Sequence, residues 1–157
     1  MSAFFFFFAV LAVVAADQAS KAWVIHAFAL HESREIIPGL FNLTYLTNNG
    51  AAFGILAGQP ALWRQIFFIG AVCVALVVIW MAQRSFSPRS RVYSAALGLI
   101  AGGAIGNLID RIRWSFVVDF LDVYLGQWHW PAFNVADSAI TVGVTLFIGY
   151  NLLFDRH

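Results

Sequence analysis

Two aspartates, far apart along the chain, could carry out hydrolytic chemistry. Asp119 follows Val117–Val118, and Asp137 follows the stretch Phe133–Ala136. Carboxylates at the edge of apolar segments are costly and usually survive only when paired or functional. If the fold brings the two carboxyls together, they cannot both ionise easily and will share one proton. Such a pair can activate a water and protonate a leaving amine, as amide hydrolysis without a metal requires.

Both aspartates also have a purely structural explanation. Asn134 and Asp137 are three positions apart, a spacing typical of a pair that caps the start of a helix. Asp119 could be a solvated strand residue. The residues alone therefore leave a catalytic pair and two unrelated structural carboxylates as open alternatives.

Other charged residues near the apolar segments also have both a functional and a structural explanation. Asp110 and Arg111 are adjacent, and they could form an ion-paired structural knot or bind different partners. Asp17 and Lys21 are four residues apart and can pair along one helix. These groups could line a site or hold helices together.

Other kinds of catalytic site are not indicated. The four histidines show no His-Glu-x-x-His spacing and have no cysteine partners, so we expect no metal ion and no cofactor. The serines lack a Gly-x-Ser-x-Gly setting. Cys73 is the single cysteine, so an intrachain disulfide is impossible.

The composition is that of an integral membrane protein. Of the 157 residues, 61% are hydrophobic and 11% are charged, whereas soluble domains carry about 25% charged residues. The length suits a single domain, 1–157. The formal net charge of +1 makes nucleic acid an unexpected partner.

Apolar stretches of spanning length predict four transmembrane helices. Their expected ranges are about 3–28, 61–82, 92–112 and 135–154, separated by segments of about 29–60 and 113–134. The first stretch could instead be a cleaved signal peptide, because Val14–Ala16 resembles a cleavage site. No Lys or Arg precedes it, however, so we expect a retained helix.

Four spans place the polar residues at one membrane face. Counting crossings gathers these residues there: Asp17, Lys21, Arg64, Asn107, Asp110, Arg111 and Asp137. The opposite face holds both termini and the loop Gln83–Arg91, which has three arginines and no acidic residue. Basic loops favour the cytoplasm, although five basic residues also lie on the polar face.

The segments at the polar face predict a small β-rich cap on the outer leaflet. Leu40–Tyr45 partly alternates and is followed by an Asn-Asn-Gly turn signal, and Phe116–Tyr124 is rich in aromatic and β-branched residues. In the third span, Gly98, Gly102 and Gly106 share one helix face, which favours close packing against another helix.

Five blocks of residues together resemble the bacterial lipoprotein signal peptidases (signal peptidase II), a family of aspartic membrane peptidases. The blocks, in the order that the family has, are Asp17–Lys21, Asn48–Gly54, Gly102–Arg111, Val117–Phe120 and Phe133–Asp137. The resemblance extends over most of the chain and leaves no motif position unmatched.

The resemblance implies a fold and a function. It implies a bundle of four transmembrane helices in the bacterial inner membrane, with both termini cytoplasmic, a periplasmic β-cradle and a short surface helix. It implies that Asp119 and Asp137 are the catalytic dyad. The substrates would be diacylglyceryl-modified prolipoproteins, cleaved just before the lipidated cysteine. Membrane lipids and inhibitors of the globomycin type are further implied partners.

With this resemblance, the polar residues receive expected roles. Those expected to bind or orient the substrate or the dyad are Asn48, Gly50, Asn107, Arg111 and Asn134. Those expected to support the pocket structurally are Asp17, Lys21 and Asp110.

Two other classes of function fit parts of the sequence. Buried acidic and basic residues also mark small proton-coupled carriers, although carriers place such residues near the midplane and often within repeated halves. A helical assembly factor would use the glycine face of the third span, but it would leave the two aspartates without a purpose.

Overall fold

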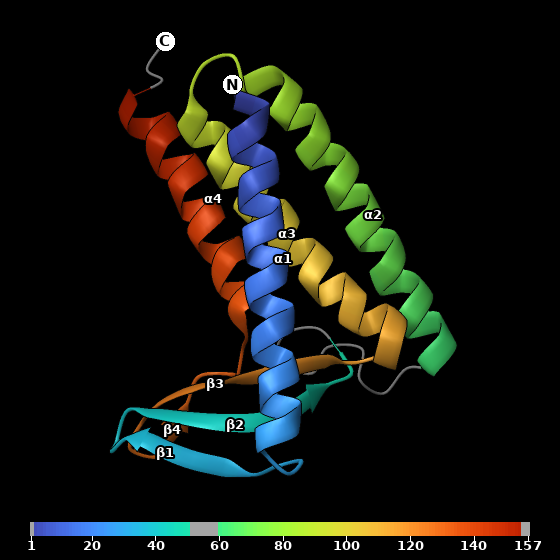
Figure 1. The fold of residues 1–157 in the computed structure, drawn as a ribbon, viewed down its shortest axis with the longest axis vertical. Helices are drawn as coiled ribbons and strands as arrows, with labels where there is room; N and C mark the ends of the chain where they lie inside the picture. The colour runs from blue at the N-terminus through green and yellow to red at the C-terminus, as the bar shows by residue number, and fades with distance from the viewer. Residues whose placement is uncertain (1, 51–59, 155–157) are drawn as a thin grey trace.

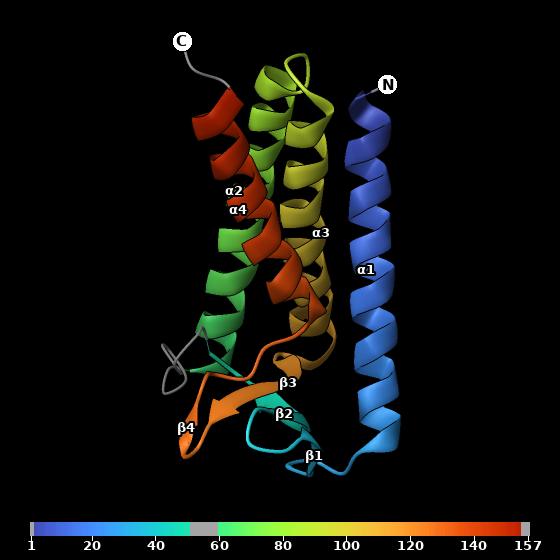
Figure 2. The same cartoon turned by 90° about the vertical axis from the view of Figure 1, so that its left-hand side faces the viewer.

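Four long apolar helices form a bundle that carries a small sheet at one end (Figure 1). The computed structural model describes residues 2–50 and 60–154. The helices are α1 (Ser2–Ala27), α2 (Ala61–Phe86), α3 (Arg91–Trp114) and α4 (Val135–Phe154). All four are long and apolar enough to cross a membrane. The start of α1 and the end of α4 lie at the end of the bundle opposite the sheet (Figure 2).

The sheet has four antiparallel strands in the order β1-β2-β3-β4. They are β1 (Ser33–Ile37), β2 (Phe41–Asn48), β3 (Val117–Leu125) and β4 (Trp128–His129). Gly39 and Gly126 lie in the two hairpin turns with φ of +76° and +62°, a conformation that glycine adopts without strain. The strands predicted within Leu40–Tyr45 and Phe116–Tyr124 are therefore confirmed as β2 and β3.

A bulge interrupts the pairing of β2 with β3. Leu43 pairs with Leu121 and Leu46 pairs with Asp119, so β2 contains one more residue than β3 over this interval. Residues paired across two strands face the same side of the sheet, and successive residues of one strand face opposite sides. The extra residue therefore changes which β2 positions face the same side as Asp119. Asn48 comes to lie on that side because of the bulge.

The third helix is the centre of the bundle. α3 packs against α1, α2 and α4 and carries the most buried residues of the four helices. A Cβ atom added at Gly98 would lie 2.5 Å from the carbonyl oxygen of Phe6, and one at Gly102 would lie 2.8 Å from the Cβ of Val13. The predicted close packing of this glycine face is confirmed, with α1 as the partner.

The outer surface of the bundle is strongly apolar. Large hydrophobic side chains such as Phe8, Leu11, Ile66 and Val74 are exposed, as expected where lipid and not water surrounds the helices. The predicted fold class, a four-helix membrane bundle with a small antiparallel sheet, is confirmed. The expected short surface helix does not occur within residues 2–50 and 60–154, and it stays a prediction.

Two helices extend beyond their apolar cores. α2 continues to Phe86, and α3 runs from Arg91 to Trp114, past the expected 92–112. Ser90 caps the start of α3 by accepting a hydrogen bond from the Val92 N–H, and Ser115 ends it with a φ of 63°. Helical hydrogen bonds continue through polar residues until a capping residue ends the helix. Hydropathy alone therefore does not locate the helix ends.

Candidate active site

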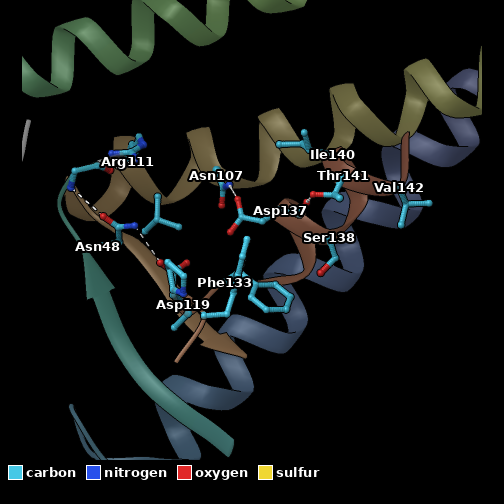
Figure 3. A pocket seen from close by; sticks show the side chains of 15 residues that line it. Asn48, Asn107, Arg111, Asp119, Phe133, Asp137, Ser138, Ile140, Thr141 and Val142 are labelled. Carbon is cyan, nitrogen blue, oxygen red and sulfur yellow. Dashed lines mark hydrogen bonds between the residues drawn. The ribbon is translucent and has the colours of Figure 1, made fainter. Parts of the chain in front are cut away.

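A cavity of about 630 Å³ opens at the sheet end of the bundle (Figure 3). The second of the five blocks extends through residues 51–54, which lie outside the described residues. The lining residues are Asn48, Gly50, Asn107, Arg111, Val117, Asp119, Trp130, Pro131, Ala132, Phe133, Asp137, Ser138, Ile140, Thr141 and Val142. All seven residues expected to be catalytic or to orient the substrate lie in or beside this cavity, and Asn134 is the one that does not line it directly.

Asp119 is a buried carboxyl held by two amides. It lies on β3 with 4% of its surface exposed. Its Oδ1 accepts a hydrogen bond of 2.8 Å from Asn134 Nδ2, and its Oδ2 accepts one of 3.2 Å from Asn48 Nδ2. Burial, and then the nearby charge of Asp137, raise the pKa of Asp119 to about 7, although both amide hydrogen bonds oppose the shift. This carboxyl can hold a proton near neutral pH.

Asp137 caps the start of α4 and faces the cavity. The Asp137 N–H donates to Asn134 Oδ1 at 3.0 Å, and the Asn134 N–H donates to Asp137 Oδ2 at 3.3 Å. This is the reciprocal pattern of a capping box, so the structural explanation of the Asn134–Asp137 spacing is confirmed. The Asp137 side chain also accepts a hydrogen bond of 2.8 Å from Asn107 Nδ2. The Asp137 carboxyl thus caps α4 and faces the cavity at the same time.

Asn134 links the two aspartates. Its side chain donates to Asp119 and accepts from the Asp137 N–H, and it is completely buried. It also lies 3.2 Å from the Asn107 amide oxygen and from the Val118 carbonyl oxygen. The structure therefore brings Asp119 and Asp137 to one cavity, where the nearby charge of Asp137 contributes to the raised pKa of Asp119.

A buried ion cluster lies behind the cavity. Lys21 Nζ lies 2.9 Å from Asp17 Oδ2 and 2.8 Å from Asp110 Oδ2, and all three side chains are at most 1% exposed. The predicted Asp17–Lys21 pair is present, and Asp110 forms its ion pair with Lys21. Asp17 also accepts a hydrogen bond from the Ala136 N–H, and so connects α1 to the first turn of α4. The expectation that this trio supports the pocket structurally stays a prediction.

Arg111, on α3, lines the cavity beside Gly50. Its Nη2 donates a hydrogen bond of 2.8 Å to the Gly50 carbonyl oxygen, and its guanidinium carbon lies 3.9 Å from the centre of the Phe68 ring. The Gly50 N–H in turn donates to Asn48 Oδ1. The adjacent residues Asp110 and Arg111 thus bind different partners, one in the ion cluster and one beside the cavity.

Several lining residues were not identified from the sequence. Thr141 lies four positions after Asp137, a helical spacing that could have indicated it, whereas Ser138 directly follows Asp137 and has no such signal. The apolar residues Trp130, Phe133 and Val142 also line the cavity. Their residue types are common throughout this chain, so no local signal distinguishes them.

Within residues 2–50 and 60–154, no three His, Cys, Asp or Glu side chains are grouped so as to hold a metal ion. The expectation that neither metal nor cofactor takes part stays a prediction. The chemistry available from the described residues is that of two carboxyls supplied with amide donors.

Known proteins are similar to this chain in sequence and in fold. Residues 9–153 match the family model described as signal peptidase (SPase) II. A lipoprotein signal peptidase of Desulforapulum autotrophicum is 50% identical over 145 residues, covering 92% of this chain and 88% of that protein. One of Geobacter sulfurreducens is 50% identical over 137 residues, covering 87% and 84%.

Solved structures support the same relationship. A bacterial membrane enzyme structure determined by the in meso method at 1.9 Å resolution has a TM-score of 0.75 and 34% sequence identity, covering 95% of this chain and 92% of that one. A second such structure, at 2.3 Å resolution, has the same TM-score and identity. The chain therefore belongs to the signal peptidase II family of lipoprotein signal peptidases, and is an aspartic peptidase and a multi-pass protein of the bacterial inner membrane.

Proposed function

We propose that this protein removes the signal peptide from diacylglyceryl-modified prolipoproteins by cleaving just before the lipidated cysteine, with Asp119 and Asp137 as the catalytic dyad. The observation that carries the proposal is the meeting of two carboxyls, one from β3 and one from α4, in one cavity at the end of an apolar bundle. An environment that lets one carboxyl hold a proton near neutral pH provides one acid and one base.

The dyad would act on a water held between the two carboxyls. The ionised aspartate takes a proton from the water as its oxygen attacks the scissile carbonyl carbon, and the protonated aspartate gives its proton to the carbonyl oxygen. Collapse of the tetrahedral intermediate then breaks the C–N bond and passes a proton to the leaving amine. Asn48, Gly50 and Arg111, at the β2 side of the cavity, would orient substrate carbonyls.

The cavity also suits a lipid-modified substrate. Its α4 side carries the apolar side chains of Ile140 and Val142, and Phe133 and Trp130 extend this wall toward the sheet. A signal peptide is itself a membrane helix, so a site at the edge of the bilayer can receive the peptide and its acyl chains laterally. The same wall would accommodate globomycin-type cyclic peptides.

Removing either carboxyl should abolish cleavage. Asp119→Asn and Asp137→Asn keep the side-chain shape but cannot act as base and acid, so we expect the rate to fall by at least about 10³-fold. The measurement is cleavage of a lipidated and an unlipidated precursor by purified protein in detergent, with a chelator present.

Asp122→Asn is the matched control, because Asp122 lies on the same strand but contacts His129 and Asn42 outside the cavity. This variant should cleave the lipidated precursor at the parent rate. Near-parent cleavage by either dyad variant would refute the dyad, and solute uptake without cleavage would favour a carrier instead.

A further inference from the structure

Three asparagines around the dyad are each held in one orientation by a group that can only donate. An amide side chain can be turned over, so its donor end is fixed only when a neighbour determines it. The three fixed contacts, all of 3.0 Å, are Gly50 N–H to Asn48 Oδ1, Lys21 Nζ to Asn107 Oδ1 and Asp137 N–H to Asn134 Oδ1. Each asparagine must then direct its NH₂ group toward a carboxyl of the dyad.

The groups behind these amides differ in charge. A neutral backbone N–H lies behind Asn48 and Asn134, the two amides that donate to Asp119. An ammonium group lies behind Asn107, which donates to Asp137 at 2.8 Å. A cation on the carbonyl oxygen polarises the amide and strengthens the hydrogen bond that its NH₂ group donates. Asp137 therefore has the better environment for a negative charge.

The Lys21 ammonium group is buried and fully engaged by its neighbours. Its three N–H groups are used by Asp17, Asp110 and Asn107, at 2.9, 2.8 and 3.0 Å, and the side chain is 1% exposed. Asn107 is thus the one neutral member of the lysine's set of partners, and the one that reaches the cavity.

We infer that Lys21 is a positioning residue of the reaction: through the Asn107 amide it makes Asp137 the charged base that takes the proton from water, and leaves the initial proton on Asp119. The inference rests on the proposed dyad. The position of Asp137 supports it, because the first turn of a helix has a positive end that favours an anion.

The charged groups that face Asp137 come from three elements. Asp119 faces it from β3, and Arg111 faces both aspartates from α3, next to Asp110. Lys21 and Asp17 of α1 interact with it electrostatically. Among these groups, Lys21 is the cation that also has a hydrogen-bonded path to Asp137.

The test is the pH dependence of kcat/KM on a lipidated precursor. In Lys21→Met the acid limb, which reports protonation of the dyad, should move to higher pH by about one unit. At pH 7, kcat should fall about tenfold while KM changes little. Lys21→Arg retains the cation and should keep the acid limb near its parent position. A Lys21→Met acid limb that stays in place would overturn the inference, whatever happens to the rate.

A double variant covers the case in which Lys21→Met does not fold. Lys21→Met with Asp110→Asn removes one charge of each sign, so the cluster keeps its net charge while Asn107 still loses its donor. The same shift of the acid limb is expected. Asp110→Asn alone retains the Lys21–Asn107 contact and should leave the limb in place. An unshifted limb in the double variant contradicts the inference.

The outcomes separate this inference from the proposed function. If Asp119→Asn and Asp137→Asn lose cleavage but the acid limb of Lys21→Met stays at its parent pH, the proposed dyad is supported and the role of Lys21 is refuted. Cleavage by either dyad variant at near the parent rate removes both. Asp122→Asn should show the parent profile in the same assay.

Discussion

Asp119 is placed where its charged form is disfavoured, and this has a cost for the folded protein. Its pKa lies at about 7 in the fold, above the ordinary value of 3.8. The folded state therefore binds the proton more tightly than the unfolded state does. Stability should fall as the pH rises from about 4 to about 7, and above pH 7 the full penalty applies. Active-site groups often carry such a cost.

The variant Asp119→Asn should remove this penalty, because an amide resembles the protonated acid. Relative to the parent, it should gain about 2–3 kcal/mol more at pH 8 than at pH 5. Thermal unfolding in detergent at the two pH values measures the difference. Asp122→Asn, on the same strand, serves as the control. An equal effect of Asp119→Asn at both pH values would mean that this carboxyl is already ionised at pH 5.

At the scale of elements, the start of α4 serves two purposes through one residue. Asn134 caps the helix through its Oδ1 and supplies Asp119 with a donor through its Nδ2. The helix cap and the donor to Asp119 therefore depend on the same side chain, and a suitable replacement can separate them.

Asn134→Ser should retain the cap and lose the donor to Asp119. A serine hydroxyl can accept from the Asp137 N–H, so the melting temperature should stay near that of the parent. The rate of cleavage should fall about tenfold or more, because a positioned donor of the dyad is gone. Asn134→Ala loses both contacts and should also lose about 1–2 kcal/mol of stability. A serine variant that cleaves at the parent rate would show that the donor to Asp119 is dispensable.

The sequence predicted the elements better than the contacts between them. Apolar runs located the four helices, and counting crossings placed Asp17 and Asp137 at one end of the bundle. The bond between Lys21 and Asn107 joins residues 86 positions apart on α1 and α3. Whether such groups meet depends on how the helices are rotated and packed against each other, and no periodicity in the sequence reports that. The contact of Arg111 on α3 with the Phe68 ring on α2 could not be predicted from the sequence for the same reason.

At the scale of the whole molecule, the polar network and the cavity lie at one end of the bundle. The last turn of α2, which contains Arg84, and the turn that follows it, which contains Arg89, lie at the other end. We propose that the arginine end is cytoplasmic and the sheet end periplasmic, because residues 83–91 form a short connection with three arginines and no acidic residue.

Labelling with a membrane-impermeant maleimide can test this orientation. The lone cysteine is first removed as Cys73→Ser, and single cysteines are then placed at Pro88 and Leu125, which are exposed at opposite ends. In intact spheroplasts, Leu125→Cys should be labelled and Pro88→Cys should not, whereas lysis should expose both. The reverse pattern would invert the proposed orientation.

The bulge in β2 makes the site depend on strand register as well as on residue type. Asn48 faces Asp119 because β2 has one residue more than β3 between their flanking pairs. If the ladder ran on from Leu43 without the extra residue, Thr47, whose short side chain carries no amide, would lie opposite Val117 in place of Asn48. Every motif residue could then be present in the sequence while Asp119 lacked this amide. Strand register, at this point of the chain, decides which side chain reaches the carboxyl.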